Sequence, residues 1–195
     1  MVQSPPRKFK FASIPDDLTG DELERLIFRR DSLGFRDFVP DQQTYRRCMS
    51  QVIRRHLPDA RRPIRWNCHT PNTPIARSLY WHVVKRLPER YRPSLRLFNA
   101  IGTTLDYWHG VDAFFWWQDA RPRCRRAEAI PRTVTIDVAV FAKPDYKANF
   151  LLTLEDIRLG RMKDICRQIA EQLLGRRTPR GIRSAPMDSR LVLRV

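Results

Sequence analysis

The 195-residue sequence lacks the segments that would carry it into or across a membrane. No apolar run approaches the roughly 20 residues that a membrane-spanning helix needs. Residues 1–17 hold prolines and charged side chains in place of the apolar stretch of a signal peptide. Hydrophobic residues at 42% and aromatic residues at 10% are nevertheless enough to build a core. We therefore expect a globular, cytoplasmic protein that has no membrane partner.

Cysteine pairs and several familiar catalytic motifs are missing as well. The cysteines stand at positions 48, 68, 124 and 166 with no CxxC pair, so a structural zinc site is not expected. Isolated thiols fit a reducing cytoplasm. There is no Walker A motif, glycine-rich dinucleotide fingerprint, HExxH or Gly-x-Ser-x-Gly pattern. These absences argue against ATP-driven, dinucleotide-dependent and serine-hydrolase functions.

Positive charge is what the sequence has in excess. Lys and Arg number 37 against 21 Asp and Glu, which gives a formal net charge of +16. Lysine occurs six times, so arginine accounts for 37 − 6 = 31 of these cations. The forked donors of arginine match phosphate oxygens, which predicts a nucleic-acid partner. The phosphates are common to DNA and RNA and do not distinguish them; our expectation is DNA rather than RNA. A GC-rich coding sequence explains arginine in place of lysine but not the surplus of charge.

Composition and turn residues divide the chain into three expected segments. Residues 1–16 are expected to form a flexible basic arm, residues 17–175 a single domain, and residues 176–195 a basic tail whose end fits an edge strand. The domain begins with helical patterns and ends with one. Expected helix starts are Thr19 with Glu22 as a capping box, Asp41, and Thr73-Pro74; the last helix, capped by Thr153-x-x-Asp156 and broken at Gly160, ends near Leu174.

Two strands are expected in the second half of the chain. Residues 111–118 are rich in aromatic side chains, and residues 133–141 alternate apolar and polar positions. An antiparallel pair with a long basic connector at 119–132 is the simplest arrangement. Helices followed by strands and a final helix predict an α/β (α+β) fold with a helical N-terminal half.

An acid interrupts each of these strands. Asp112 follows the His109-Gly110 turn, and Asp137 stands between Ile136 and Val138 in the middle of a strand. A carboxylate within a strand is costly unless a cation, a hydrogen-bond network or solvent meets it. Two such carboxylates on neighbouring strands can share Mg²⁺, with Mn²⁺ as the alternative. Simpler interpretations remain open here: Asp112 as a turn or strand-start residue, Asp137 on the wet face of an antiparallel sheet, and Lys143 as an ordinary loop lysine.

Gly110-Val-Asp112 together with Ile136-Asp-Val138 and a following lysine resembles the core of the PD-(D/E)XK nucleases. The resemblance implies a restriction-endonuclease-like mixed central sheet flanked by helices, and Mg²⁺-dependent hydrolysis of phosphodiester bonds. Asp112 and Asp137 would match the two motif acids and hold the metal. The strict pattern places lysine two residues after the second acid, where this chain has Ala139, so Lys143 would be a migrated lysine. Glu22 or Glu24 would supply the acid that sometimes joins the site from an early helix.

The resulting hypothesis is a metal-dependent endonuclease with Asp112, Asp137 and Lys143 as its catalytic residues. Arginines of the connector and of the second helix would grip the nucleic-acid backbone. The alternative is a non-catalytic basic subunit that binds nucleic acid within a larger nucleoprotein or mobile-element assembly, alongside other protein subunits. The candidate backbone-binding residues are Arg46, Arg47, Arg54, Arg55, Arg121, Arg123, Arg125 and Arg126.

Overall fold

The computed structural model describes residues 14–15, 17–28, 44–56, 66–117 and 132–176. Several expected features lie outside these residues: the basic arm up to residue 13, the cap at Asp41, the tail beyond residue 176, and most of the connector with Arg121, Arg123, Arg125 and Arg126. Among the described helices, none has the length and apolar character needed to span a bilayer.

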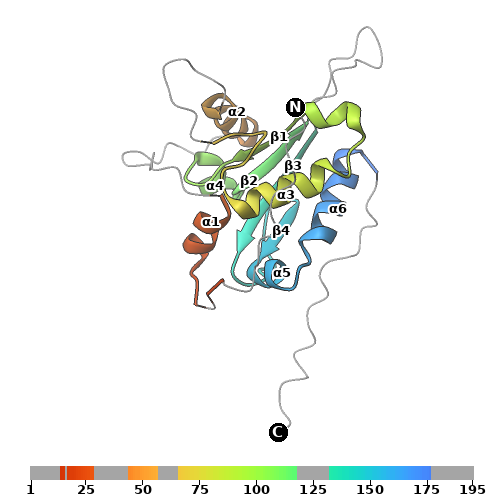
Figure 1. The fold of residues 1–195 in the computed structure, drawn as a ribbon. Helices are drawn as coiled ribbons and strands as arrows, with labels where there is room; N and C mark the ends of the chain where they lie inside the picture. Colours follow the sequence, from red (N-terminus) through yellow and green to blue (C-terminus); the bar gives the residue numbers. More distant parts are fainter. Residues whose placement is uncertain (1–13, 16, 29–43, 57–65, 118–131, 177–195) are drawn as a thin grey trace.

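A four-stranded mixed sheet forms the centre of the fold (Figure 1). Its strands are β1 (Leu95–Asn99), β2 (Ala113–Trp117), β3 (Arg132–Ala139) and β4 (Phe150–Thr153), in the order β1-β2-β3-β4. The first three run antiparallel, which confirms the expected pairing of β2 with β3, and β4 runs parallel to β3. The two outer strands were not expected: β1 has neither the aromatic run of β2 nor the long alternation of β3, and β4 has only four residues.

Six α-helices surround the sheet in the described part of the chain. Capping side chains explain where two of them begin: Thr73 accepts from the amide of Ala76 at α3, and Thr153 forms a complete capping box with Asp156 at α5. α3 ends earlier than the expected stop at Pro88. The helices are α1 (Gly20–Phe28), α2 (Tyr45–His56), α3 (Pro74–Val84), α4 (Thr104–His109), α5 (Leu154–Arg158) and α6 (Met162–Leu173), with a 3-10 helix η2 (Glu89–Ser94) before β1.

The two faces of the sheet are covered by different elements. Alternation along β2 places Phe115 on one face, where the Tyr80 ring of α3 stacks on it with 6.5 Å between centroids. α6 packs beside α3 on this face (Figure 1). Phe98 and Phe114 stack on each other on the opposite face, where His56 of α2 contacts Phe98. The face under α2 is also the face that carries Asp112 and Asp137.

Polar contacts fix α1 against the sheet. Thr73 donates a hydrogen bond to the carbonyl oxygen of Ile27. The amide of Asn99 in β1 donates to the carbonyl oxygen of Phe28 at 2.9 Å. Both contacts hold the C-terminal end of α1, whose buried side of Leu23, Ile27 and Phe28 then faces the core. Ile14 is buried too, although it falls within the range expected for a flexible arm.

Candidate functional site

Asp112 occupies the position just before β2 and lies on the α2 face of the sheet. Ala113 pairs with Ile136, so extending this register by one residue sets Asp112 opposite Asp137. The main chain of Asp112 continues the ladder, donating to Ile136 and accepting from Ala100. One carboxylate oxygen, Oδ2, accepts from the amide of Val138 at 2.6 Å. Asp112 lies in a bend at the start of the strand, as one of the simpler interpretations expects, and it is also buried, with 2% of its surface exposed.

Asp106 enters the site from α4, and the sequence did not identify it. Thr103 caps this helix, and the carboxylate of Asp106 turns back to accept from the amide of Gly102 at 2.7 Å. Gly110, with φ 57°, ends the helix in the left-handed conformation that suits glycine. The chain then turns directly into Asp112. The short helix therefore brings two acids, six positions apart in sequence, to the same end of the sheet.

Glu24 completes the cluster from α1. Glu22, the other acid considered for this role, bonds instead to the amide and hydroxyl of Thr19 and serves as part of the helix cap. Carboxylate oxygens of Glu24, Asp106 and Asp112 all lie within 4.8 Å of one another. We call these three residues the acidic cluster. Their convergence is produced by three separate elements, each held by its own caps and anchoring hydrogen bonds.

Crowding of carboxylates in a partly dry site shifts their ionisation. Burial, followed by the charges of Asp106 and Asp21, raises the pKa of Glu24 to about 7. Burial, followed by the charges of Glu24 and Asp106, also raises the pKa of Asp112 well above its usual value. The hydrogen bond from the Val138 amide opposes this rise in Asp112. The cluster is thus a set of acids whose ionised form lacks sufficient positive charge nearby.

Asp137 lies beside the acidic cluster but has its own cation. The Lys143 ammonium contacts both carboxylate oxygens of Asp137, at 2.8 Å to Oδ2 and 3.0 Å to Oδ1. Asp137 is 3% exposed, so its interpretation as a residue on a wet sheet face is wrong. Lys143 comes from the loop that joins β3 to β4, and its side chain is about half exposed. It is an ion-pair partner of a buried acid, and the interpretation as an ordinary loop lysine is also wrong.

The arginines of α2 lie close to the helix that carries Asp106. Thr104 of α4 donates to Gln51 of α2 at 3.1 Å, and the rings of Tyr45 and His109 meet edge to face at 5.3 Å. The side chains of Arg46, Arg47 and Arg54 are exposed, and that of Arg55 is partly exposed.

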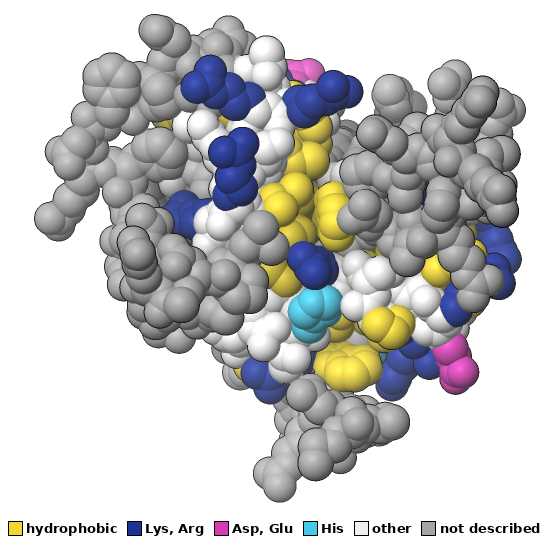
Figure 2. All heavy atoms as spheres, turned by 90° about the horizontal axis from the view of Figure 1, so that it is seen from above, with side chains coloured by type: hydrophobic (Ala, Val, Ile, Leu, Met, Phe, Trp, Pro, Cys, Tyr) yellow, Lys and Arg dark blue, Asp and Glu magenta, His cyan; other side chains and the backbone are white. Residues whose placement is uncertain are grey.

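Charge is unevenly distributed along the described chain. Residues 44–56, 66–88 and 90–105 contain no Asp or Glu. Figure 2 shows the surface that these segments reach at the top of Figure 1: Lys and Arg side chains surround a strip of apolar ones, and Asp and Glu appear only near its margins. The cations in these three segments are Arg46, Arg47, Arg54, Arg55, Arg77, Lys85, Arg86, Arg90, Arg92 and Arg96. We call this part of the molecule the basic half.

Comparison with known proteins produced no significant match to a protein-family model, to a curated protein or to a solved structure. The functional argument therefore depends on the residues of this chain. The donor set of the acidic cluster, three carboxylates and no sulfur or imidazole, suits a hard divalent cation such as Mg²⁺. The raised pKa of Glu24 and Asp112 fits the same ligand, because a dication would relieve the repulsion that causes part of the shift.

Proposed function

We propose that this chain is a Mg²⁺-dependent nuclease that hydrolyses phosphodiester bonds, with DNA favoured over RNA as the substrate. The observation that carries the proposal is the convergence of Glu24, Asp106 and Asp112 next to the Asp137–Lys143 ion pair. A cluster of acids in a chain of net charge +16 is otherwise hard to explain, since the rest of the molecule favours a polyanionic partner.

Glu24, Asp106 and Asp112 are the residues that would hold the metal ion. Bound there, Mg²⁺ would polarise a phosphate oxygen and lower the pKa of a water molecule. Asp112 is the most constrained of the three, because its Oδ2 is tied to the Val138 amide. Asp137, assigned to the metal from the sequence, contributes its negative charge to the site while its oxygens bond to Lys143.

Lys143 would act on the substrate from its position on Asp137. The bidentate contact holds the ammonium at the rim of the site, and its half-exposed side chain leaves it accessible to a phosphate. A positioned cation next to the scissile group offsets the charge that develops on phosphoryl oxygens. In this proposal Lys143 takes the role of the lysine that the strict nuclease pattern places at the position of Ala139.

The proposal includes a restriction-endonuclease-like fold. Three features support it: a mixed central sheet with helices on both faces, acids at the start of β2 and within β3, and an acid supplied by the early helix α1. The arginines of α2 would then bind the backbone of the substrate close to the metal.

Cleavage assays with matched variants test the function. Wild-type protein with Mg²⁺ or Mn²⁺ should cut DNA or RNA of at least one form, and EDTA should abolish the activity. Asp112→Asn should reduce cleavage by at least a hundredfold while nucleic-acid binding persists, because it removes one ligand and leaves the basic half intact. Asp164→Asn, which removes an exposed acid of α6, is the control. Cleavage by Asp112→Asn at the wild-type rate would refute the proposal.

One observation favours a second candidate, a non-catalytic nucleic-acid-binding subunit. Ala139 stands where a catalytic lysine is expected, and Lys143 is already engaged with Asp137. This candidate predicts salt-sensitive binding that is indifferent to EDTA and produces no cleavage products. The same cleavage assay therefore separates the two functions.

A further inference from the structure

Arg96 in β1 is a cation that the fold leaves without a polar partner. Its Nε–H is buried and has no hydrogen-bond acceptor. No carboxylate of the described chain forms an ion pair with it, and the segments on either side of it belong to the basic half. A buried donor that lacks an acceptor is unusual in a folded protein and calls for an explanation. Two other described side chains share this feature, Trp108 and Trp117, but neither of them is charged.

The guanidinium of Arg96 is held in place by an aromatic ring. Arg96 pairs with Trp116 across β1 and β2, and its Cζ lies 5.6 Å from the centroid of the Trp116 ring. The edge of Trp116 in turn meets Phe98. A guanidinium over an aromatic face keeps its N–H donors at its own rim, where they match two oxygens of a phosphate. Arg96 as a whole is partly exposed, so an anion from solvent can approach this rim.

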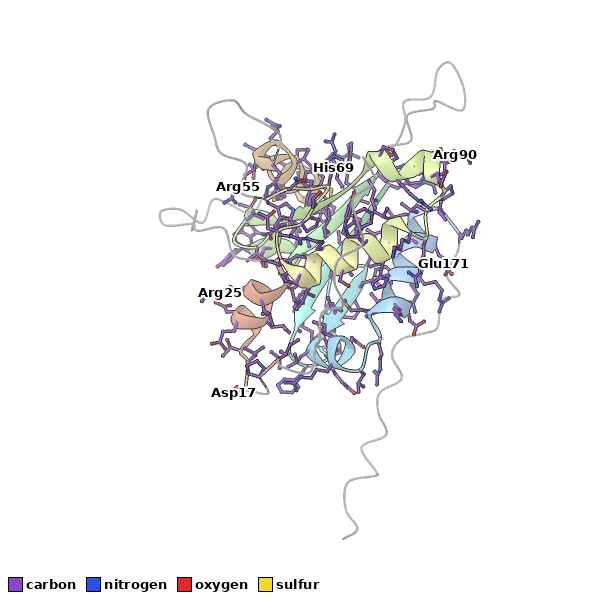
Figure 3. The ribbon with its side chains drawn as sticks, viewed as in Figure 1. Asp17, Arg25, Arg55, His69, Arg90 and Glu171 are labelled. Atoms are coloured by element: carbon purple, nitrogen blue, oxygen red, sulfur yellow. The ribbon has the colours of Figure 1, made fainter. Side chains whose placement is uncertain are left out.

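The surroundings of Arg96 are positive and neutral. Burial, and then the charge of Arg96, lowers the pKa of His69, which lies in the segment that follows Trp66 along the edge of β1. Figure 3 shows His69 between Arg55 and Arg90 on the upper surface of the molecule, the surface that faces the reader in Figure 2. A neutral imidazole beside the guanidinium leaves the site open to an anion and offers no carboxylate to compete with it.

Arg96 and the acidic cluster share one face of the sheet. Trp116, Phe114 and Asp112 alternate onto the same face of β2, and Arg96 lies opposite Trp116. Trp116 and Asp112 are four positions apart, a distance of about 13 Å along a strand. α2, with its arginines, packs on the same face, where His56 contacts Phe98.

We propose that Arg96 binds a backbone phosphate of the nucleic acid, separate from the phosphate that enters the acidic cluster on the same face of the sheet. The inference rests on the proposed function for its substrate and adds a specific anchoring residue to it. A phosphate at the Nη donors, which are not among the buried unpaired atoms, supplies the negative charge that no described side chain provides. Arg96 is thus a binding residue that helps to position the substrate on this face of the sheet.

Binding measurements in EDTA test this proposal without interference from cleavage. Fluorescently labelled single-stranded and double-stranded DNA and RNA are titrated with wild type, Arg96→Gln and Arg167→Gln over a range of salt concentrations. Arg167 is the control because it removes the same charge from α6 on the opposite face of the sheet. Arg96→Gln should weaken binding about tenfold and reduce the slope of log K against log salt by about 0.7 to 0.9. Arg167→Gln should change the affinity less than twofold.

A second variant and a second measurement separate the loss of the guanidinium fork from a failure of Arg96→Gln to fold. Arg96→Lys retains the charge and the contact with Trp116 but lacks the fork, so it should keep the salt slope and lose several-fold in affinity. If Arg96→Gln fails to fold, the Arg96 Nε–H signal of wild type is followed by nuclear magnetic resonance instead. Arg96→Lys identifies this signal because it lacks it. The signal should shift when nucleic acid is added to wild type.

The outcomes separate this inference from the proposed function. Equal effects of Arg96→Gln and Arg167→Gln, or an Nε–H signal that does not move when nucleic acid is added, would each overturn the role of Arg96. In those cases wild type still binds and cuts nucleic acid, and the proposed function stands. If wild type binds no nucleic acid at all, both proposals fail.

Discussion

Replacing Glu24 with glutamine should stabilise the metal-free protein at alkaline pH. A folded-state pKa raised from 4.5 to about 7 means that the ionised carboxylate disfavours folding. The shift corresponds to about 3 kcal/mol for a fully desolvated group. Glu24 is only partly buried, so solvent screening reduces this to about 1 to 2 kcal/mol. For a chain of this length, this gain in the free energy of unfolding corresponds to a rise in Tm of roughly 2 to 8 °C.

The sign of the pH dependence follows from the direction of the shift. The contribution of protonated Glu24 to stability is fully present below pH 4.5 and is lost as the pH rises through about 7. Wild-type Tm in EDTA should therefore fall between pH 5 and pH 8, and Glu24→Gln should flatten this fall. Added Mg²⁺ should restore wild type at pH 8, by about 3 kcal/mol at one hundred times its Kd. Glu24→Gln should gain much less from the ion.

Thermal melts followed by circular dichroism at both pH values, with EDTA or Mg²⁺, measure all of these quantities. Glu22→Gln is the matched control, since it removes the same charge from the same helix at a position that bonds to Thr19. It should leave the Mg²⁺ effect unchanged. A lower Tm for Glu24→Gln at pH 8 in EDTA, or an unaltered Mg²⁺ response, would show that the acidic cluster is not a strained metal site.

Three further changes probe the parts around Glu24. Lys143→Met should cost about 2 kcal/mol in urea unfolding because it leaves Asp137 buried without its cation, and adding Asp137→Asn should recover more than half of that loss; no recovery would mean that Lys143 acts through other contacts. Asp106→Asn should lower the pKa of Glu24 in a carboxyl-carbon titration and weaken Mn²⁺ binding in calorimetry, and an unmoved pKa would place Asp106 outside the cluster. Gly110→Ala should cost about 1 kcal/mol for its left-handed φ alone, since no atom lies within 4 Å of the added methyl; a much larger loss in thermal denaturation would contradict this account.

Local chemistry in the sequence predicted the helix starts and the central strand pair. Thr19, Thr73 and Thr153 each begin a helix because a threonine oxygen satisfies free amides of the first turn, an interaction that depends on only a few neighbouring residues. The strand β2 could be recognised by its aromatic composition and β3 by its alternation. The strand β1 has the same length as β2 but lacks its aromatic run, and β4 has only four residues, so the place of both in the sheet depends on pairing with distant segments.

The site was harder to predict for a related reason. Asp112 and Asp137 stood out because an acid in a strand is costly, and the structure indeed buries both. Asp106 did not stand out, because Thr103-x-x-Asp106 has the spacing of an ordinary helix cap. The choice between Glu22 and Glu24 depends on how α1 is rotated against the sheet, which the anchors at Ile27 and Phe28 decide. Tertiary contacts of this kind leave no signal at the position of the acid itself.

The basic half and the acidic cluster would have opposite electrostatic effects on a nucleic acid. The positive surface attracts the backbone over long range, whereas Glu24 and Asp112 in their ionised forms would repel any phosphate that came near them. A divalent cation reverses the second effect without altering the first. Binding to the basic half should therefore survive EDTA, and protection of the cluster from chemical modification by bound DNA should require Mg²⁺. Full protection of Glu24 by DNA in EDTA would contradict this account, because DNA would then reach the acidic cluster without a divalent cation to offset the repulsion.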